Sequence, residues 1–379
     1  MTDENTWSVA AASRRGVSHL QSKAPCQDAF GCWSSSLAGT PCSILAVSDG
    51  HGAEDYHHSH FGSFLAIRAA YEEFIEFFQW YALVKTGPSS SAGVQPTGLE
   101  RDFKASFGRR IVRRWRENVK VFREEVLRSN LPFDESEGNE FKPFGCTLLA
   151  AMITSDRAFF FQLGDGGIFV RRNGGELLSL SEDDDGPGEA TDSLASSDPE
   201  KAAVTSVLTL EEVSAVMLAT DGLTKSFSKG DEEPVPKGIR QTVDWLLNRV
   251  SVEKLDVEGP VFDQFLDRCS KGGTGDDVTV ALAFSRGALF ADEKAEAAEE
   301  TPQKADESED ATRINEPEAD ESTRPSESGT SADPPEDQKS DRAEHGGDTL
   351  ANQATESEAG RPIKPLDKEE PPTEAKDVF

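Results

Sequence analysis

Four aspartates in this chain stand at the ends of short apolar runs: Asp28, Asp49, Asp221 and Asp276. A run such as 44–47, too short for a helix and stopped by a turn signal, is typical of a buried strand. The end of such a strand is a place where a rigid scaffold can hold reactive side chains. One Asp-Gly step is most simply an ordinary turn, but four aspartates in this position within one domain indicate a shared role.

Buried carboxylates need partners, because removing a carboxylate from water without one costs free energy. The basic residues beside these aspartates are few, namely Lys23, Lys225 and Lys271. Hard divalent cations therefore account best for the set, and two Mg²⁺ or Mn²⁺ ions can clamp one water for attack on a phosphate. Asp165, which follows a very hydrophobic run in the sequence LGDGG, extends the pattern. The alternative is that each aspartate only caps its own turn.

The segments that must position these aspartates indicate an α+β layered fold. Apolar patterns predict strands over 7–13, 28–33, 42–48, 146–154, 158–163, 167–172, 213–219 and 278–284. Helical spacing predicts helices over 59–83, 99–129, 241–250 and 261–269. Residues 14–25 are expected to form a loop and 181–200 an acidic, flexible insertion. The order lacks the strand–helix–strand alternation that a doubly wound parallel sheet requires.

Charge and composition divide the chain in two. The 379 residues carry a formal net charge of −31, and residues 287–379 contribute 27 acidic and ten basic side chains. That segment lacks the apolar residues needed to offset chain entropy, so we expect a catalytic domain over 1–286 and an acidic disordered tail over 287–379. A chain this acidic is not expected to bind nucleic acid, because phosphate contacts need a positive face.

The remaining composition predicts a cytoplasmic monomer. Five cysteines without a CxxC pair indicate reduced thiols rather than a disulfide framework or a zinc site. The sequence begins without the charged-then-apolar pattern of a signal peptide, and its apolar runs are the size of strands. These runs are far shorter than a membrane span, so no membrane association is expected.

An ordered set of motifs resembles the metal-dependent Ser/Thr phosphatases of the phosphatase 2C-like family. The motifs are HLQSKAPCQDAF (19–30), VSDGHG (47–52), GCTLLA (145–150), QLGDGG (162–167), ATDGL (219–223) and GDDVTV (275–280). Each is weak alone, but the ordered set over about residues 7–285 is specific. It is most similar to the bacterial-type branch, where the first motif ends in CQDA. The resemblance implies a central β-sandwich of two antiparallel sheets flanked by helices, in four αββα layers.

The resemblance also implies a role for each motif residue. Asp28, Asp49, Asp221 and Asp276 would hold two Mn²⁺ or Mg²⁺ ions, and Gly50 would add a backbone carbonyl. Asp165, together with Asp221, matches positions that bind a third, weaker ion in some members. His51 matches the proposed general acid, which suits an imidazole that titrates near neutral pH. The alternative for His51 is an exposed turn histidine beside the metals.

Two positions depart from the family pattern. The arginine that binds phosphate in the family, five residues before the first metal aspartate, is Lys23 here, which keeps the charge but loses the planar bidentate fork. A solvated loop lysine is the other interpretation. Many members have Glu directly before that aspartate, where this chain has Gln27, which can still orient a water, though less strongly.

We therefore expect a phosphatase that hydrolyses phosphoserine and phosphothreonine in phosphorylated protein substrates. The resemblance implies attack by a metal-bridged hydroxide, without a phospho-enzyme, at a site that includes His51 and Lys23. Two alternatives stay open. The changes at Lys23 and Gln27 favour a catalytically weakened scaffold or phosphopeptide-binding protein, and the same metals would also serve a phosphoesterase acting on small molecules.

Overall fold

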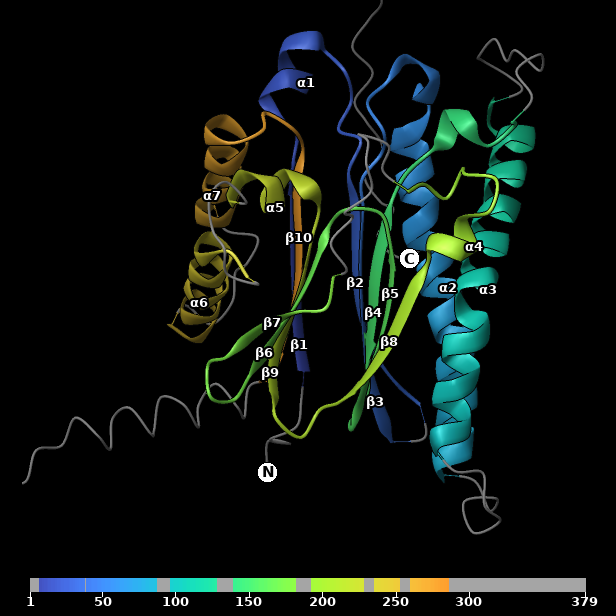
Figure 1. Cartoon of the computed structure of the whole chain (residues 1–379), viewed down its shortest axis with the longest axis vertical. Coiled ribbons are helices and arrows are strands. Elements are labelled where there is room, and N and C mark those ends of the chain that lie inside the picture. Colours follow the sequence, from blue (N-terminus) through green and yellow to red (C-terminus); the bar gives the residue numbers. More distant parts are fainter. Residues whose placement is uncertain are drawn as a thin grey trace, which may run out of the picture. The chain divides into compact units, whose positions relative to one another are not determined.

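The apolar runs pair into two antiparallel sheets. The computed structural model describes residues 7–37, 39–86, 96–127, 139–181, 192–227, 235–252 and 260–285. One sheet has the order β1 (Trp7–Arg14), β10 (Val278–Ser285), β9 (Val213–Ala219), β6 (Gly167–Arg172) and β7 (Leu177–Ser179). The other has the order β2 (Ala29–Leu37), β3 (Thr40–Ser48), β4 (Leu148–Ile153), β5 (Arg157–Leu163) and β8 (Val204–Thr209). Figure 1 shows the two sheets face to face.

Helices cover the outer face of each sheet, giving the four αββα layers (Figure 1). The long helices α2 (Ser59–Thr86) and α3 (Pro96–Glu125) lie over the β2–β8 sheet. The outer face of the other sheet carries α5 (Asp221–Phe227), α6 (Lys237–Val252) and α7 (Pro260–Gly272). Four short helices complete the elements: α1 (Val17–Ser22), η1 (Glu54–Tyr56), η4 (Lys142–Phe144) and α4 (Pro199–Ala202).

Three apolar layers hold the stack together. Leu45, Leu149 and Val216 belong to the layer between the sheets, where side chains of both inner faces interdigitate. The layer beneath α2 and α3 is rich in phenylalanine, including Phe74, Phe77, Phe103, Phe107 and Phe159. Met217, Leu266 and Phe284 belong to the layer beneath α6 and α7. The central strands are buried on both faces, which is why their sequences are continuous apolar runs rather than alternating ones.

The structure confirms the predicted fold class and departs from the expected elements at several places, three of which concern the segments around the candidate site and the sheet edges. Residues 17–22, expected as loop, form α1, whose backbone is held by contacts to the distant 270–275 segment. The hairpin of β2 and β3 pairs Leu37 with Thr40, so both strands run further into the serine-rich turn than expected. The strand β8 was not predicted, because VTSVLT has only a weak apolar pattern. It pairs with β5 and forms the edge of that sheet.

Several predictions concern features beyond the described residues. The boundary at residue 286 and the tail over 287–379 lie outside them, as does most of the acidic insertion, 182–191. All five cysteines are described and none forms a disulfide. None of the helices in the described ranges combines the length and the apolar character that a membrane crossing needs.

Candidate metal centre

The end of β3 brings Asp49 to one end of the sandwich, the end that carries α1 and α5 in Figure 1. The hydroxyl of Ser48 donates to the carbonyl of Thr147 at 2.5 Å, and the backbone N–H of Asp49 donates to Thr147 Oγ1 at 3.0 Å. Thr147, the residue before β4, thus fixes the last residues of β3 by hydrogen bonds. The carboxylate of Asp49 is therefore presented from a fixed backbone, as the sequence predicted for a strand end.

Gly50 lets the strand end approach the segment that carries Asp28. Its N–H donates to the carbonyl of Gln27 at 3.1 Å. A Cβ at Gly50 would lie 2.8 Å from that carbonyl oxygen and 2.9 Å from the Ser59 backbone, distances that real Cβ atoms essentially never show. The glycine is needed here for close approach rather than for a positive φ. The two aspartate-bearing segments, 27–28 and 49–50, are held together by this contact.

Gln27 is buried, and its hydrogen bonds connect three segments of the chain. The side-chain amide of Gln27 donates to the backbone carbonyl of His51 at 3.2 Å and to Ser59 Oγ at 2.8 Å. The backbone carbonyl of Gln27 accepts from Ser63 Oγ at 2.5 Å. These contacts join the DGHG turn to the start of α2. The amide nitrogen is therefore committed to the protein, and the side-chain oxygen Oε1 is the atom that would orient a water.

Asp277 anchors α1 and the Asp28 segment to the start of β10. Its side chain is buried, and its two carboxylate oxygens accept from the backbone N–H groups of Gly16 and Gln27, each at 2.6 Å. His19 Nδ1 lies 2.9 Å from Asp277 Oδ1. Charge-assisted contacts to backbone donors are strong and short, so this carboxylate acts as a clasp. The clasp fixes Gln27, and with it the neighbouring Asp28.

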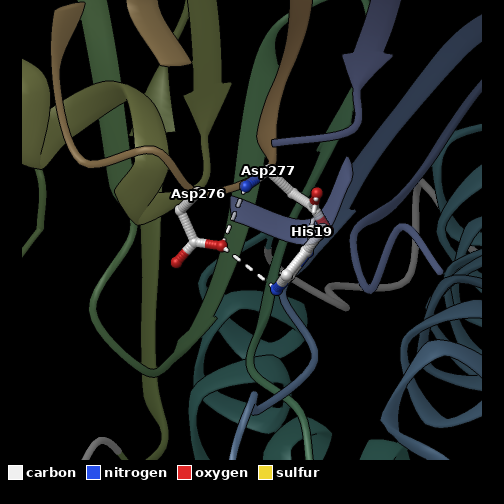
Figure 2. Close-up of side chains that lie close together, drawn as sticks. All are labelled: His19, Asp276 and Asp277. Carbon is white, nitrogen blue, oxygen red and sulfur yellow. Dashed lines mark hydrogen bonds and ion pairs between the residues drawn. The ribbon is translucent and has the colours of Figure 1, made fainter. Parts of the chain in front are cut away.

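Figure 2 shows Asp276 beside this clasp. Its Oδ1 accepts from the N–H of Asp277 at 2.8 Å and lies 3.9 Å from His19 Nε2. The ligand atoms of His19, Asp276 and Asp277 all lie within 4.8 Å of one another, a spacing that a metal ion could use. Because both oxygens of Asp277 are already occupied by backbone donors, we interpret the trio as a structural clasp with Asp276 on its outer side.

Asp28 and Asp221 come from opposite sheets and meet through the Thr220 hydroxyl. Thr220 Oγ1 donates to Asp28 Oδ2 at 2.9 Å and accepts from the N–H of Thr279 at 3.0 Å. Asp221 follows Thr220 directly and is the first residue of α5, where the helix N-terminus favours a carboxylate. The predicted strand 213–219 is observed as β9, and the helix α5, which was not predicted, begins at the aspartate two residues later.

The four carboxyl groups repel one another. Burial, with the nearby Asp277 carboxylate, raises the pKa of Asp28 well above its ordinary value. Burial, together with the charges of Asp28 and Asp221, does the same to the pKa of Asp49, and burial raises the pKa of Asp276. For Asp221, burial alone would raise the pKa, but the neighbouring carboxyl group of Asp49 and the ion pair with Lys225 lower it.

Two carboxylate oxygens of this group have the character of metal ligands. Asp28 Oδ1 and Asp221 Oδ1 are buried, and no hydrogen-bond donor reaches either within the described ranges. A buried carboxylate oxygen without a partner is costly, and the other oxygen of each residue is already committed to Thr220 or Lys225. Oxygen donors of this kind suit Mg²⁺ and Mn²⁺. The residues present therefore fit a divalent metal centre.

His51 lies at the rim of the group, and its ring is partly buried. Its backbone N–H donates to the carbonyl of Gly145 at 3.2 Å, and its ring meets Tyr56 edge-on with centroids 4.8 Å apart. Burial lowers the pKa of His51, although the charges of Asp165 and Asp221 oppose the shift. The imidazole is thus near enough to Asp165 and Asp221 for their charges to act on it, and it is partly buried rather than fully exposed.

Asp165 lies in the turn between β5 and β6 and joins the group through a lysine. Lys225 Nζ donates to Asp165 Oδ2 and to Asp221 Oδ2, each at 2.7 Å. The family resemblance matches Asp165 to a position that binds a third metal ion in some members. Lys225 brings an ammonium group to the same two carboxylates, from a position four residues along α5 from Asp221.

Lys23 lies at the C-terminal end of α1 and is exposed. Its φ is 62°, in the left-handed region that non-glycine residues rarely adopt, and it is the one such residue among those described. This backbone conformation ends α1 and turns the chain toward Asp28. The structure thus fixes the backbone of Lys23 while leaving its side chain in solvent.

Sequence reasoning missed the roles of His19, Asp277 and Lys225. The contacts of Asp277 span 250 or more residues of sequence, so no local pattern reveals them. His19 sits within the motif 19–30 but depends on the same long-range contacts. Lys225 was detectable, because a lysine four residues after an aspartate at a helix start lies on the same face.

The match to one family model agrees with the motifs. The family model described as Protein phosphatase 2C matches residues 15–257. No curated protein matches the chain in sequence. Among solved structures, this chain is similar to the serine/threonine phosphatase Stp1 from Staphylococcus aureus, with 14% identity and a TM-score of 0.45. The alignment covers 74% of this chain and 95% of that one.

Two further solved structures are similar at the same level. The S. agalactiae serine/threonine phosphatase is 19% identical with a TM-score of 0.40, and the alignment covers 74% of this chain and 100% of that one. The catalytic domain of the serine/threonine protein phosphatase PstP, in complex with two manganese ions, is 18% identical with a TM-score of 0.41. That alignment covers 73% of this chain and 97% of that one.

Proposed function

The chain belongs to the protein phosphatase 2C family, and from this premise we propose that it is a metal-dependent protein phosphatase acting on phosphoserine and phosphothreonine. The observation that carries the proposal is the pair of buried, unpartnered oxygens, Asp28 Oδ1 and Asp221 Oδ1, inside a group of mutually repelling carboxylates. Such a group needs divalent cations to be stable in its charged form, and divalent cations are what hydrolysis of a phosphate ester requires here.

We propose that Asp28, Asp49, Asp221 and Asp276 hold two Mn²⁺ or Mg²⁺ ions, with the backbone carbonyl of Gly50 as a further ligand. Bound ions would supply the positive charge that activates water and stabilises the phosphoryl group during its transfer. The protein's own part is to fix the ligands. Thr220 orients Asp28, Thr147 fixes the backbone at Asp49, and the Asp277 clasp sets the loop that carries Asp28.

His51 is assigned the general acid that protonates the departing serine or threonine oxygen. Its ring lies against Tyr56 and is near enough to Asp165 and Asp221 for their charges to act on it. Burial lowers the pKa of His51, which makes its protonated form a stronger acid toward an alkoxide leaving group. Lys23 is assigned to the substrate phosphate as a mobile point charge, because its exposed side chain leaves it free to reach an incoming ligand.

The substrate class is tested with a panel measured on the purified full chain. Phosphoserine and phosphothreonine peptides, a phosphotyrosine peptide and p-nitrophenyl phosphate are compared with and without added Mn²⁺. We expect the highest kcat/KM on the phosphoserine and phosphothreonine peptides, and only with metal. Equal or higher kcat/KM on the small ester would favour the small-molecule phosphoesterase. Binding of phosphopeptides without turnover would favour the weakened scaffold.

A further inference from the structure

Lys225 is the feature of the site that the proposed function does not use. Its ammonium group lies 2.7 Å from Asp165 Oδ2 and 2.7 Å from Asp221 Oδ2. The two carboxylates come from distant parts of the chain, one from the turn between β5 and β6 and the other from the start of α5. Both are largely buried, with side chains 15% and 14% exposed, whereas the lysine is 53% exposed.

A lysine in this position does the work of a bound cation. Two converging carboxylates repel each other and need a positive charge between them. An N···O distance of 2.7 Å to each carboxylate places the ammonium where an ion would have to sit, because Mg²⁺ binds oxygen ligands at about 2.0–2.1 Å. Hydrogen bonds from the ammonium group to both carboxylates favour its charged form.

The lysine also divides the two oxygens of Asp221 between two tasks. Oδ2 accepts from Lys225, and Oδ1 remains buried without a donor among the described residues. A helix places residues i and i+4 on one face, so α5 holds the ammonium beside Asp221 as long as its first turn is formed. Asp221 therefore keeps one oxygen for the buried centre while its other oxygen is neutralised from the solvent side.

We infer that Lys225 is a built-in cation that occupies the Asp165–Asp221 end of the centre and keeps a further divalent ion from binding there. This inference rests on the proposed metal centre. A tethered ammonium cannot dissociate, so this end of the site holds its charge at any free metal concentration. Lys225 acts as a positioning residue for Asp221, and Asp165 acts as its anchor rather than as a metal ligand.

The test is the number of Mn²⁺ ions bound per full-length chain, measured by isothermal titration calorimetry and by equilibrium dialysis with metal analysis. Lys225→Met removes the ammonium but keeps much of the side-chain volume, and Lys225→Arg keeps the charge. Lys201→Met is the matched control, because Lys201 also pairs with an aspartate at 2.8 Å but lies on α4, against α3. Far-UV circular dichroism and the thermal midpoint check that each variant is folded.

We expect Lys225→Met to bind one more Mn²⁺ ion than the wild type, and Lys225→Arg and Lys201→Met to bind the same number as the wild type. The extra ion should disappear in the double variant Lys225→Met with Asp165→Asn. An unchanged number in folded Lys225→Met overturns the inference, and so does an Asp165-dependent ion in the wild type. Failure of the proposed function has a different signature, because the wild type would then bind no Mn²⁺ that Asp28→Asn removes.

Discussion

At the scale of single residues, the partner of each carboxylate decides its role. Asp277 is saturated by two backbone donors, so it holds structure. Asp28 and Asp221 each keep one buried oxygen without a donor among the described residues, so they can hold metal. The adjacent pair Asp276 and Asp277 shows that sequence position alone cannot separate these roles. Both follow the same glycine, but only one is turned into the protein.

Lys23→Gly separates the charge of Lys23 from its backbone conformation. The left-handed region costs a non-glycine residue about 1–2 kcal/mol, while glycine adds about 0.5–1 kcal/mol of chain entropy on folding. We therefore expect the free energy of unfolding, measured by urea denaturation, to stay within about 1 kcal/mol of the wild type. If Lys23 contacts the substrate phosphate, KM for a phosphopeptide should rise about tenfold with little change in kcat.

Lys23→Arg is the companion variant, because it restores a fork that can bind phosphate through two hydrogen bonds. It should lower KM relative to the wild type. Unchanged KM in both variants, with normal stability, would show that Lys23 is only a loop lysine.

At the scale of elements, the ends of strands and helices are fixed by the backbone of other elements. The first turn of α5 packs on the chain at Asp277, so close that a Cβ at Gly222 would lie 1.9 Å from the Asp277 carbonyl oxygen. This contact sets Asp221, on α5, beside Asp276, which precedes β10. The glycine is required at this position by the approach of two backbones.

Gly222→Ala should therefore move α5 away from the start of β10. Overpacking of this kind costs about 1–3 kcal/mol, and a displacement near 1 Å at a catalytic group costs on the order of a hundredfold in rate. We expect a lower urea midpoint and a fall in kcat/KM for a phosphopeptide. Gly98→Ala in α3 is the control, because a Cβ there meets nothing within 4 Å. If Gly222→Ala behaves like Gly98→Ala, the close packing at α5 does not position Asp221.

The sequence predicts most elements because their signals are local. The apolar runs of β3, β4, β9 and β10 and the helical spacing of α2 and α3 each show within about ten residues. The helix α1 has six residues and no buried one, so its stability comes from the 270–275 segment rather than from its own pattern. The candidate metal-binding aspartates were found because they stand at element ends, whereas His19 and Asp277 depend on contacts across the whole chain.

At the scale of the whole molecule, the candidate centre lies where the two sheets end together. The β2–β8 sheet contributes Asp28 and Asp49, and the other sheet contributes the segments with Asp221 and Asp276. Asp165 lies in the connection from one sheet to the other. No single hairpin or helix holds a complete ligand set, so metal binding should require the folded sandwich.

The acidic tail is proposed to lie outside this folding unit. Residues 287–379 carry 27 acidic and ten basic side chains and lack the apolar pattern of a core. Truncation after Arg286 should leave the urea midpoint of the remaining chain almost unchanged, because the removed segment contributes no core burial. A clear drop in that midpoint would mean that the tail packs against the domain.

The central claim is that the carboxylate group holds the metal that the phosphatase reaction needs. The most direct measurement is the Mn²⁺ dependence of kcat/KM for a phosphothreonine peptide, with the wild type compared with Asp28→Asn. Asp198→Asn serves as the control, since Asp198 pairs with Lys201 on the surface.

We expect metal-stripped wild type to be inactive and to regain activity on addition of Mn²⁺, as should Asp198→Asn. Asp28→Asn should fall by a factor on the order of a hundred or more at every Mn²⁺ concentration, the size expected when a positioned electrostatic group is lost. Full activity in the metal-stripped wild type, or wild-type activity in Asp28→Asn, would contradict the claim.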